Sequence, residues 1–468
     1  MPSAVTGSTT NGPSPLRIES TPRFPIVIAV AALTTAWLLV YGPTITGGFI
    51  KDDFAFVYHG HLHGWSSISP SSPSPGGFYR PLVQLTFSAT EAVFGTNPVP
   101  YALTNLFLGL ACAASLFALA RALGLAAWAA LAATAVWAFN FHGINMALLW
   151  FSGRTSLLGT LFSTLAALAL TRNHSLAAGG LALMAFLAKE EVVALPLILT
   201  LWLVMSGLSV KRSLGLWGAL AVYLVLRAYA GAVGISNAPP YYRFNFDPVH
   251  VATNIVEYAD RSMTLGVLVL IATAVALNRL PAPTSREWRL VWMGSVWLIG
   301  GFAATIWLPV RSSLYAVFPS VGFALAVGTL LAATARNAES QRAWRVAIAG
   351  VILPFLLLPI YWQRNVRWTE LRDLSAATTK AIRSDNVPGQ RLVVLEDDLS
   401  TRANFRHVFG GQLPEAAALL FDGVSLWIEP PPPEIDAASK PADRGRIVTF
   451  RLVDGRVQPS PPKSLADD

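Results

Sequence analysis

One apolar stretch near the start of the chain decides its fold class: FPIVIAVAALTTAWLLVYGPTITGGFIKDD, residues 24–53. No charged residue occurs between Arg23 and Lys51, so this run is long enough for a helix to cross a hydrocarbon core about 30 Å thick. It is too long for the core of a secretory signal peptide, and it lacks a clear small-x-small cleavage site. We therefore predict an uncleaved membrane helix that ends close to two adjacent carboxylates, Asp52 and Asp53.

Apolar runs of this kind recur along the 468 residues. The chain is 53% hydrophobic and 13% charged, with a mean hydropathy of +0.50, whereas soluble proteins are about 25% charged. The sequence therefore predicts an all-α polytopic membrane protein with about eleven transmembrane helices. We place them at residues 25–48, 100–120, 124–145, 155–172, 175–188, 191–209, 213–233, 263–280, 290–310, 314–334 and 344–362.

The charges between these runs indicate an orientation. With the N-terminus in the cytoplasm, the cytoplasmic loops are short and mostly basic, as the positive-inside rule expects. The external loops are longer and carry both signs. Because the basic residues are spread singly, the net charge of +8 does not indicate nucleic-acid binding. Residues 1–23, rich in Ser, Thr, Pro and Gly, predict a disordered cytoplasmic N-terminus ahead of a transmembrane domain over 24–362.

The last part of the chain, residues 363–468, has a different character. The segments RLVVLED (391–397) and RIVTFRL (446–452) alternate as strands do, and LPEAAALLF (413–421) is typical of a short helix behind a proline. An odd number of spans places this part outside the cell. We predict a small external α/β domain.

Asp52 and Asp53 stand at the external end of the first helix. Two close carboxylates raise the pKa of one of them, and partial burial adds to this. Such a group can take a proton from an acceptor hydroxyl as a general base. Its neighbour would orient it or hold a divalent cation. The alternative is a solvated loop that caps the stretch FAFVYHG.

Four cations are predicted on the same external face: Arg80 in GGFYRPL, Arg154 in WFSGRTSLLG, Lys189 in FLAKEEVV and Arg311 in LPVRSSLY. Charges at a bilayer edge are normally kept for a partner, and guanidinium groups bind phosphate through two hydrogen bonds. The cations would therefore suit a lipid-linked phosphate. Two simpler readings stay open: Arg80 extends to the membrane interface, and Lys189 forms an ion pair with Glu190 alone.

Three histidines, His59, His61 and His63, alternate in HGHLH. On a strand they would point to one side and could bind zinc. A helix would scatter them, and the pattern favours an exposed loop over a metal site.

Taken in order, FIKDDFAFV, YRPLVQLTFSATEAVFG, WFSGRTSLLG, FLAKEEVV and VRSSLYAVFPSVGFALAVG resemble the membrane half of the transmembrane and tetratricopeptide-repeat O-mannosyltransferases and their bacterial relatives, within the GT-C glycosyltransferase class. The resemblance covers roughly residues 25–335. It implies a helical enzyme that takes a sugar from a polyprenyl-phosphate carrier on the non-cytoplasmic face.

The resemblance also implies roles for single residues. Asp52 matches the catalytic base and Asp53 its acidic neighbour. Other matched positions, of which the basic ones would bind the carrier phosphate, are Arg80, Arg154, Lys189, Glu190, Arg311 and Tyr315.

This chain departs from the family in two places. The segment NFHGINMALLW, residues 140–150, lacks the family's His-Pro pair and acid, and the C-terminal repeats are absent. The tail is similar to the small periplasmic tails of bacterial GT-C proteins, which implies a bacterial inner membrane.

We therefore expect a membrane glycosyltransferase that acts on a protein or glycan acceptor among membrane lipids. The rival is a transporter or flippase for a lipid-linked glycan, or a scaffold without catalytic activity. Transporters tend to carry ionisable groups near the bilayer midplane, often in repeated halves. The charges here gather at one face and no repeat is visible, which favours the enzyme. The sequence does not separate transfer of one sugar from transfer of a whole glycan.

Overall fold

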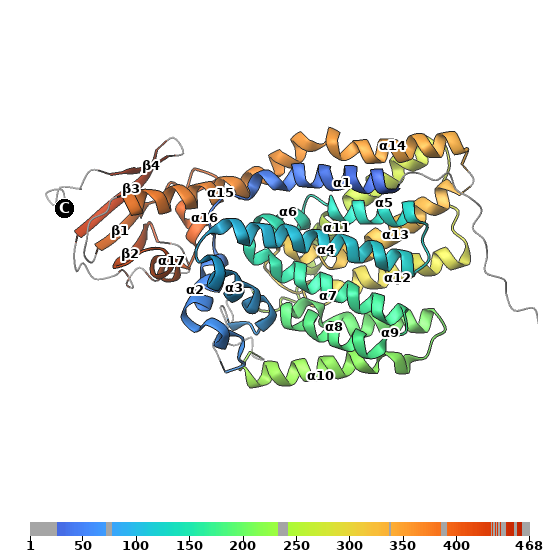
Figure 1. Cartoon of the computed structure of the whole chain (residues 1–468), viewed down its shortest axis with the longest axis horizontal. Coiled ribbons are helices and arrows are strands. Elements are labelled where there is room, and N and C mark those ends of the chain that lie inside the picture. Colours follow the sequence, from blue (N-terminus) through green and yellow to red (C-terminus); the bar gives the residue numbers. More distant parts are fainter. Residues whose placement is uncertain are drawn as a thin grey trace, which may run out of the picture.

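The computed structural model describes residues 26–71, 77–232, 242–336, 338–384, 391–431, 446–453 and 456–460, with single positions 433, 436, 438 and 440. The predicted N-terminal stretch 1–23 lies outside the described residues. Elsewhere the chain is a helical bundle joined to one small sheet, as the sequence predicts (Figure 1).

The bundle and the helices at its end account for most of the chain. The helices are α1 (Ile26–Tyr41), α2 (Asp52–His63), α3 (Pro81–Phe94), α4 (Pro98–Ala122), α5 (Ala127–Ala138), α6 (Gly143–Leu149), α7 (Arg154–Thr171), α8 (Ser175–Ala188), α9 (Leu195–Met205), α10 (Leu214–Tyr229), α11 (Pro248–Leu277), α12 (Ser285–Gly301), α13 (Pro319–Ala335), α14 (Ser340–Leu356) and α15 (Leu358–Ser384).

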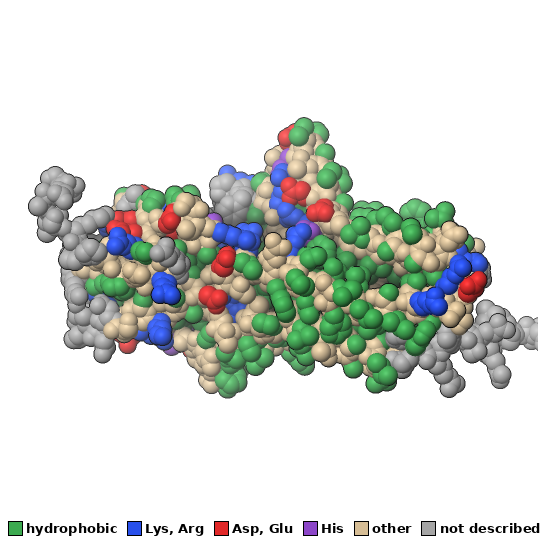
Figure 2. Space-filling model, turned by 90° about the horizontal axis from the view of Figure 1, so that it is seen from above, with side chains coloured by type: hydrophobic (Ala, Val, Ile, Leu, Met, Phe, Trp, Pro, Cys, Tyr) green, Lys and Arg blue, Asp and Glu red, His purple; other side chains and the backbone are tan. Residues whose placement is uncertain are grey.

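Five stretches within the described part of the chain are helical, long and apolar enough to cross a membrane. They are Ile26–Thr44, Pro98–Ala122, Phe151–Thr171, Pro248–Leu277 and Ser340–Ser384. The helices α5, α8 and α13 are shorter but also apolar. Each of the eleven predicted ranges overlaps a helix. Figure 2 shows the resulting surface, with a broad hydrophobic face over the helices and charged side chains gathered toward the ends.

Several predicted boundaries are wrong, among them the end of the helix predicted at 290–310 and the single helix predicted at 124–145, which is two helices, α5 and α6. Two further ones have a clear physical reason. Helix α11 begins at Pro248 rather than 263, because the Asp247 carboxylate accepts a hydrogen bond from the Val249 amide and Pro248 suits a first turn. Its first half carries charged residues, which a search for apolar runs leaves out. Helix α9 begins at Leu195 rather than 191, because residues Glu190–Ala194 form a 3₁₀ turn.

The C-terminal unit contains a four-stranded sheet in the order β2-β1-β3-β4. Its strands are β1 (Arg391–Glu396), β2 (Val424–Glu429), β3 (Arg446–Val453) and β4 (Arg456–Pro459), and its short helices are α16 (Phe405–Phe409) and α17 (Leu413–Leu420). Strand β1 is parallel to β2 and to β3, while β4 is antiparallel to β3. Both predicted strands and the predicted helix are present.

Helix α15 runs as one helix from the bundle toward this sheet (Figure 1). The predicted domain boundary at 362/363 falls inside it. The C-terminal unit lies at one end of the bundle, where α17 packs against α2 (Figure 1).

Candidate functional site

The first turn of α2 places its two aspartates in different surroundings. Asp52 is exposed, and Asp53 is fully buried. One oxygen of Asp53 accepts hydrogen bonds from the Ser152 amide at 2.7 Å and the Ser152 hydroxyl at 2.6 Å, and the other accepts from the Ile50 amide at 3.1 Å. Asp53 therefore fastens α2 to the turn that precedes α7.

The two carboxyl groups also differ in their electrostatics. Burial raises the pKa of Asp53 to about 6, although the hydrogen bonds from Ser152 and Ile50 oppose the rise. Surrounding protein also raises the pKa of Asp52, while the charges of Arg80 and Lys51 act to lower it. Asp52 is thus a solvent-accessible carboxylate with a raised pKa, which is the property that a general base requires.

Arg80, just before α3, lies close enough to Asp52 to affect its pKa, and it makes a two-point ion pair with Glu190. Its Nε lies 2.9 Å from Glu190 Oε2, and a terminal nitrogen lies 2.5 Å from Glu190 Oε1. Burial acts to raise the pKa of Glu190, but Arg80 outweighs it and lowers the pKa to about 2. Glu190 is therefore a fixed counter-ion rather than a base, and it orients Arg80.

Lys189, beside Glu190, makes a second buried pair. Its Nζ donates to the Ser156 hydroxyl at 2.5 Å and lies 2.9 Å from Glu191 Oε2. The same Nζ lies 5.2 Å from the centre of the Tyr315 ring, which comes from the 3₁₀ turn before α13. The structure thus brings together four predicted residues: Arg80, Lys189, Glu190 and Tyr315.

Arg154, predicted to bind phosphate, lies elsewhere. Its guanidinium is fully buried and donates to Asn105 Oδ1, to the Tyr101 carbonyl and to the Thr86 hydroxyl. It also lies 4.1 Å above the Phe87 ring. Because protein groups surround this guanidinium, it supports the packing behind Asp53 and offers no face to a ligand.

Arg311 lies beside the N-terminal half of α11. Its Nε donates to Asn254 Oδ1 at 2.8 Å, and a terminal nitrogen lies 3.1 Å from Glu257 Oε1. Arg261 shares the same carboxylate at 2.6 Å. The side chain is one-third exposed and therefore remains accessible. Tyr258 stands between this pair and Tyr315, with 6.4 Å between the two tyrosine rings.

The three histidines lie on a helix and not in the loop that the sequence favours, because α2 runs as a helix to His63. His59 and His63 are one turn apart with their rings 4.6 Å apart, while His61 lies 2.8 Å from Glu91. Across the described ranges, no group of three or more His, Cys, Asp or Glu side chains could hold a metal ion.

Two residues that shape the site are not indicated by the sequence. Ser152 contacts Asp53, whereas the sequence pattern points to Arg154, two positions later. Arg372 on α15 is fully buried and donates to the carbonyls of Thr44, Gly47 and Gly48, more than 300 positions earlier in the chain. Only tertiary structure brings such residues together.

Among the comparisons with known proteins, the comparison with solved structures gives matches. No protein-family model and no curated protein sequence matches the chain. Two solved structures of ArnT from Cupriavidus metallidurans, one apo and one bound to undecaprenyl phosphate, match at TM-scores of 0.52 and 0.51. Each is 14% identical, and each alignment covers 92% of this chain and 93% of that one.

The chain therefore shares its overall fold with the ArnT structures. At 14% identity the likeness establishes the fold and leaves the chemistry to be argued from this chain's own residues. It agrees with the fold that the sequence resemblance implies. The likeness and the five long apolar helical stretches in the described part of the chain together support a multi-pass membrane protein.

Proposed function

We propose that this protein transfers a sugar from a polyprenyl-phosphate carrier to a hydroxyl acceptor, with Asp52 as general base. The first turn of α2 carries the proposal, because an exposed carboxylate there lies beside a buried, fixed one and within the field of Arg80. The shared fold with ArnT, one structure of which is bound to undecaprenyl phosphate, supports a polyprenyl phosphate as the carrier.

In the proposed reaction, the Asp52 carboxylate accepts the proton of the acceptor hydroxyl. The acceptor oxygen forms a bond to the anomeric carbon of the sugar. The bond from that carbon to the phosphate oxygen breaks, and its electron pair leaves with the polyprenyl phosphate. Attack opposite to the leaving group inverts the configuration at the carbon, and Asp52 afterwards returns its proton to water.

The leaving phosphate gains negative charge and needs cations that are already in place. Arg80 suits this role, because Glu190 holds it at one edge of the site and its side chain is partly exposed. Lys189 is buried and paired with Glu191, so it would add positive charge from behind Arg80 rather than contact the phosphate. Arg311 is accessible and adds a further positive charge beside α11, and the Tyr315 hydroxyl can donate a hydrogen bond. Arg154 is assigned to the support behind Asp53, since its guanidinium is fully buried.

The side chains around Asp52 do not favour a divalent cation. Both oxygens of Asp53 already accept hydrogen bonds from the protein, and the charged groups that influence Asp52 are Lys51 and Arg80. Asp53 therefore suits the role of a group that orients α2. We place the site on the non-cytoplasmic face of a bacterial inner membrane, with the C-terminal unit in the periplasm and a protein or glycan as acceptor.

The test is sugar transfer in membranes that contain the wild type, Asp52→Asn or the control Asp422→Asn, which removes an exposed carboxylate of the C-terminal unit. Labelled polyprenyl-phosphate sugars are supplied, and labelled products are identified by mass spectrometry. We expect transfer by the wild type and the control, and none by Asp52→Asn at equal folded amount. An equally active Asp52→Asn removes Asp52 from the chemistry. If the wild type transfers from none of the donors, the proposal fails, and flipping of the same lipids becomes the next measurement.

A further inference from the structure

The segment that leads into Asp52 is held from outside the bundle. Arg372 of α15 donates to the Thr44 carbonyl at 2.6 Å, to Gly47 at 2.8 Å and to Gly48 at 3.3 Å. The Gly48 amide donates back to the Arg372 carbonyl at 2.9 Å. A Cβ on Gly47 would lie 2.5 Å from the Arg372 Cβ, so the two backbones approach closely enough to require glycine. One α15 residue thus satisfies three carbonyls of the loop backbone.

Further contacts continue along the same segment toward Asp52. The Ser375 hydroxyl of α15 donates to the Phe49 carbonyl at 2.6 Å. The Lys51 amide donates to the Val408 carbonyl of α16 at 2.6 Å, and Phe54 stacks on Phe409 with ring centres 5.5 Å apart. The backbone before Asp52 and the Phe54 side chain after it are therefore in contact with the C-terminal unit.

Lys51 itself has an uncommon backbone conformation, with φ of 52° and ψ of −127°. A side chain with a Cβ rarely adopts such angles, and a conformation of this kind persists only where the surroundings impose it. The hydrogen bond to Val408 is such a constraint. Because Lys51 is the residue directly before Asp52, its angles set the direction in which the first turn of α2 starts.

We propose that α15 and the C-terminal unit position the general base: Arg372 fixes the loop, the contact from Lys51 to Val408 fixes its last residue, and together they aim Asp52 at the acceptor hydroxyl. This inference rests on the proposed function. Transfer chemistry is sensitive to displacements of about 1 Å, and a base on a loop needs a second layer of contacts to hold it that closely.

Two variants test the inference, with a matched control on the same helix. Arg372→Lys keeps the charge but cannot reach three carbonyls. Ser375→Ala removes the hydroxyl that donates to the Phe49 carbonyl and leaves the charges near Asp52 unchanged. The control is Arg383→Lys, because Arg383 also lies on α15 but, among the described residues, donates to the Leu420 carbonyl inside the C-terminal unit.

We expect kcat to fall about tenfold or more in Arg372→Lys and severalfold in Ser375→Ala, with an unchanged KM for the donor, because both loosen the loop that aims Asp52. The control should retain wild-type kcat. Wild-type kcat in both test variants overturns the inference.

Hydrogen–deuterium exchange over residues 44–54 keeps this test separate from that of the proposed function. Faster exchange in Arg372→Lys than in Arg383→Lys supports the positioning contact, and equal exchange overturns it, whether or not the wild type transfers sugar. A wild type without transfer therefore defeats the proposed function alone.

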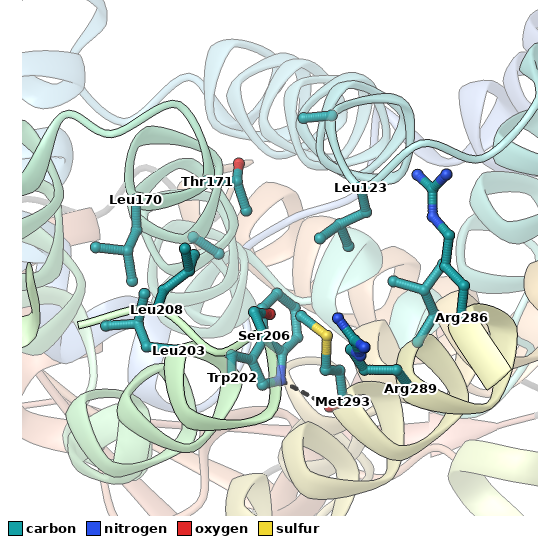
Figure 3. Close-up of a pocket in the computed structure, with 13 residues that line it drawn as sticks. Leu123, Leu170, Thr171, Trp202, Leu203, Ser206, Leu208, Arg286, Arg289 and Met293 are labelled. Atoms are coloured by element: carbon teal, nitrogen blue, oxygen red, sulfur yellow. Dashed lines mark hydrogen bonds between the residues drawn. The ribbon is translucent and has the colours of Figure 1, made fainter. Parts of the chain in front are cut away.

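A second, independent observation concerns the end of the bundle away from Asp52. A cavity of about 230 Å³ lies there between the ends of α4, α7 and α9 and the start of α12 (Figure 3). Its walls are mostly apolar, with Leu123, Leu203 and Met293 among them, and Arg286 and Arg289 of α12 border it. Within the described part of the chain, neither arginine has a hydrogen bond or an ion pair, and both are exposed.

We infer that this cavity binds the phosphate headgroup of an anionic membrane lipid, with its acyl chains along the apolar wall. Two guanidinium groups without carboxylate partners complement a phosphate, and a basic pocket between the ends of membrane helices is typical of such sites. The neighbouring ion pair between Glu287 and Arg336 leaves Arg286 and Arg289 free for a ligand.

The test uses the delipidated full chain and native mass spectrometry. Phosphatidylglycerol, phosphatidylcholine and inorganic phosphate are added separately to the wild type, to Arg286→Gln/Arg289→Gln and to the control Arg279→Gln, an exposed arginine outside the cavity. We expect phosphatidylglycerol to be retained by the wild type and the control and lost at least fivefold by the double variant, as about 1 kcal/mol per cation near the lipid surface implies. Equal retention by the double variant, or retention of inorganic phosphate in place of the lipid, overturns the inference.

Discussion

Two groups of polar residues flank the first turn of α2. They contain the same residue types but have different roles. Behind the turn lie Asp53, Ser152 and Arg154, all buried and bonded to protein. In front lie Asp52, which is exposed, and Arg80, which is held by its counter-ion Glu190 and acts on Asp52. The rear group has its hydrogen-bonding capacity occupied, whereas the exposed Asp52 carboxylate keeps capacity for a ligand. The role of each charged side chain therefore depends on the groups that it contacts and not on its residue type.

Replacement of each aspartate by asparagine is the most direct test of the difference between the front and rear groups. Asp52→Asn should lower transfer by about 10²–10⁴-fold, the usual contribution of a general base, and leave the thermal midpoint unchanged. The measurement is initial rate with a labelled donor, beside a melting curve of the same preparation. A loss of less than tenfold would place the base elsewhere.

Asp53→Asn should act first on stability. The amide nitrogen it introduces cannot accept the hydrogen bonds that one carboxylate oxygen receives, so buried donors of Ser152 or Ile50 lose their acceptor at a cost of about 2 kcal/mol. We expect a lower thermal midpoint and a smaller fall in rate than in Asp52→Asn. Ser152→Ala serves as the control, since it should show a milder form of the same loss. Equal melting of Asp53→Asn and the wild type would contradict the separation into front and rear.

Two arginine variants test the same difference, with Arg80 in the front group and Arg154 in the rear group. Arg80→Lys should weaken donor binding about tenfold, because lysine lacks the planar pair of donors that meets both Glu190 and a phosphate. Arg154→Lys should change donor binding little and should lower the thermal midpoint, since three buried acceptors lose their partner. The measurements are the KM for the donor and the melting curve. Reversed effects would mean that Arg154, and not Arg80, meets the phosphate.

The smallest expected effect is in the pH dependence. The surrounding protein raises the pKa of Asp52 above its ordinary value of 3.8, although its side chain is solvent-accessible, and only the ionised form accepts a proton. The rate should therefore fall as the pH decreases through that raised pKa, so the acid limb of kcat/KM lies above pH 3.8. Arg80 lowers this pKa, and Arg80→Gln should move the limb to higher pH. A shift to lower pH would show that Arg80 does not act on the base.

Much of the fold could be predicted because a membrane imposes strong rules on a sequence. Apolar runs marked the helices, and alternation marked β1 and β3. The errors arose where charge and turn chemistry override hydropathy. The first half of α11, which carries Glu257 and Asp260, is missing from the helix that the apolar run predicts. The alternation of His59, His61 and His63 hides the helix in which they lie.

The candidate site was predicted in part. The adjacent acids, Arg80 and the pair at Lys189 and Glu190 stand out because charges are rare in such a chain, and the structure brings Arg80, Lys189, Glu190 and Tyr315 together. The role of Arg154 could not be read in the same way. A charge at a helix entrance looks the same in sequence whether it faces a ligand or the interior.

The sequence by itself determined that the chain crosses a membrane many times, that a small α/β unit follows, and that two carboxylates stand at the end of the first helix, because hydropathy and residue order depend on local composition. Tertiary structure alone decided which aspartate is buried, which arginine is accessible, and that Arg372 and Val408 hold the loop before Asp52. Burial and hydrogen bonding depend on segments hundreds of residues apart, and these meet only when the helices pack.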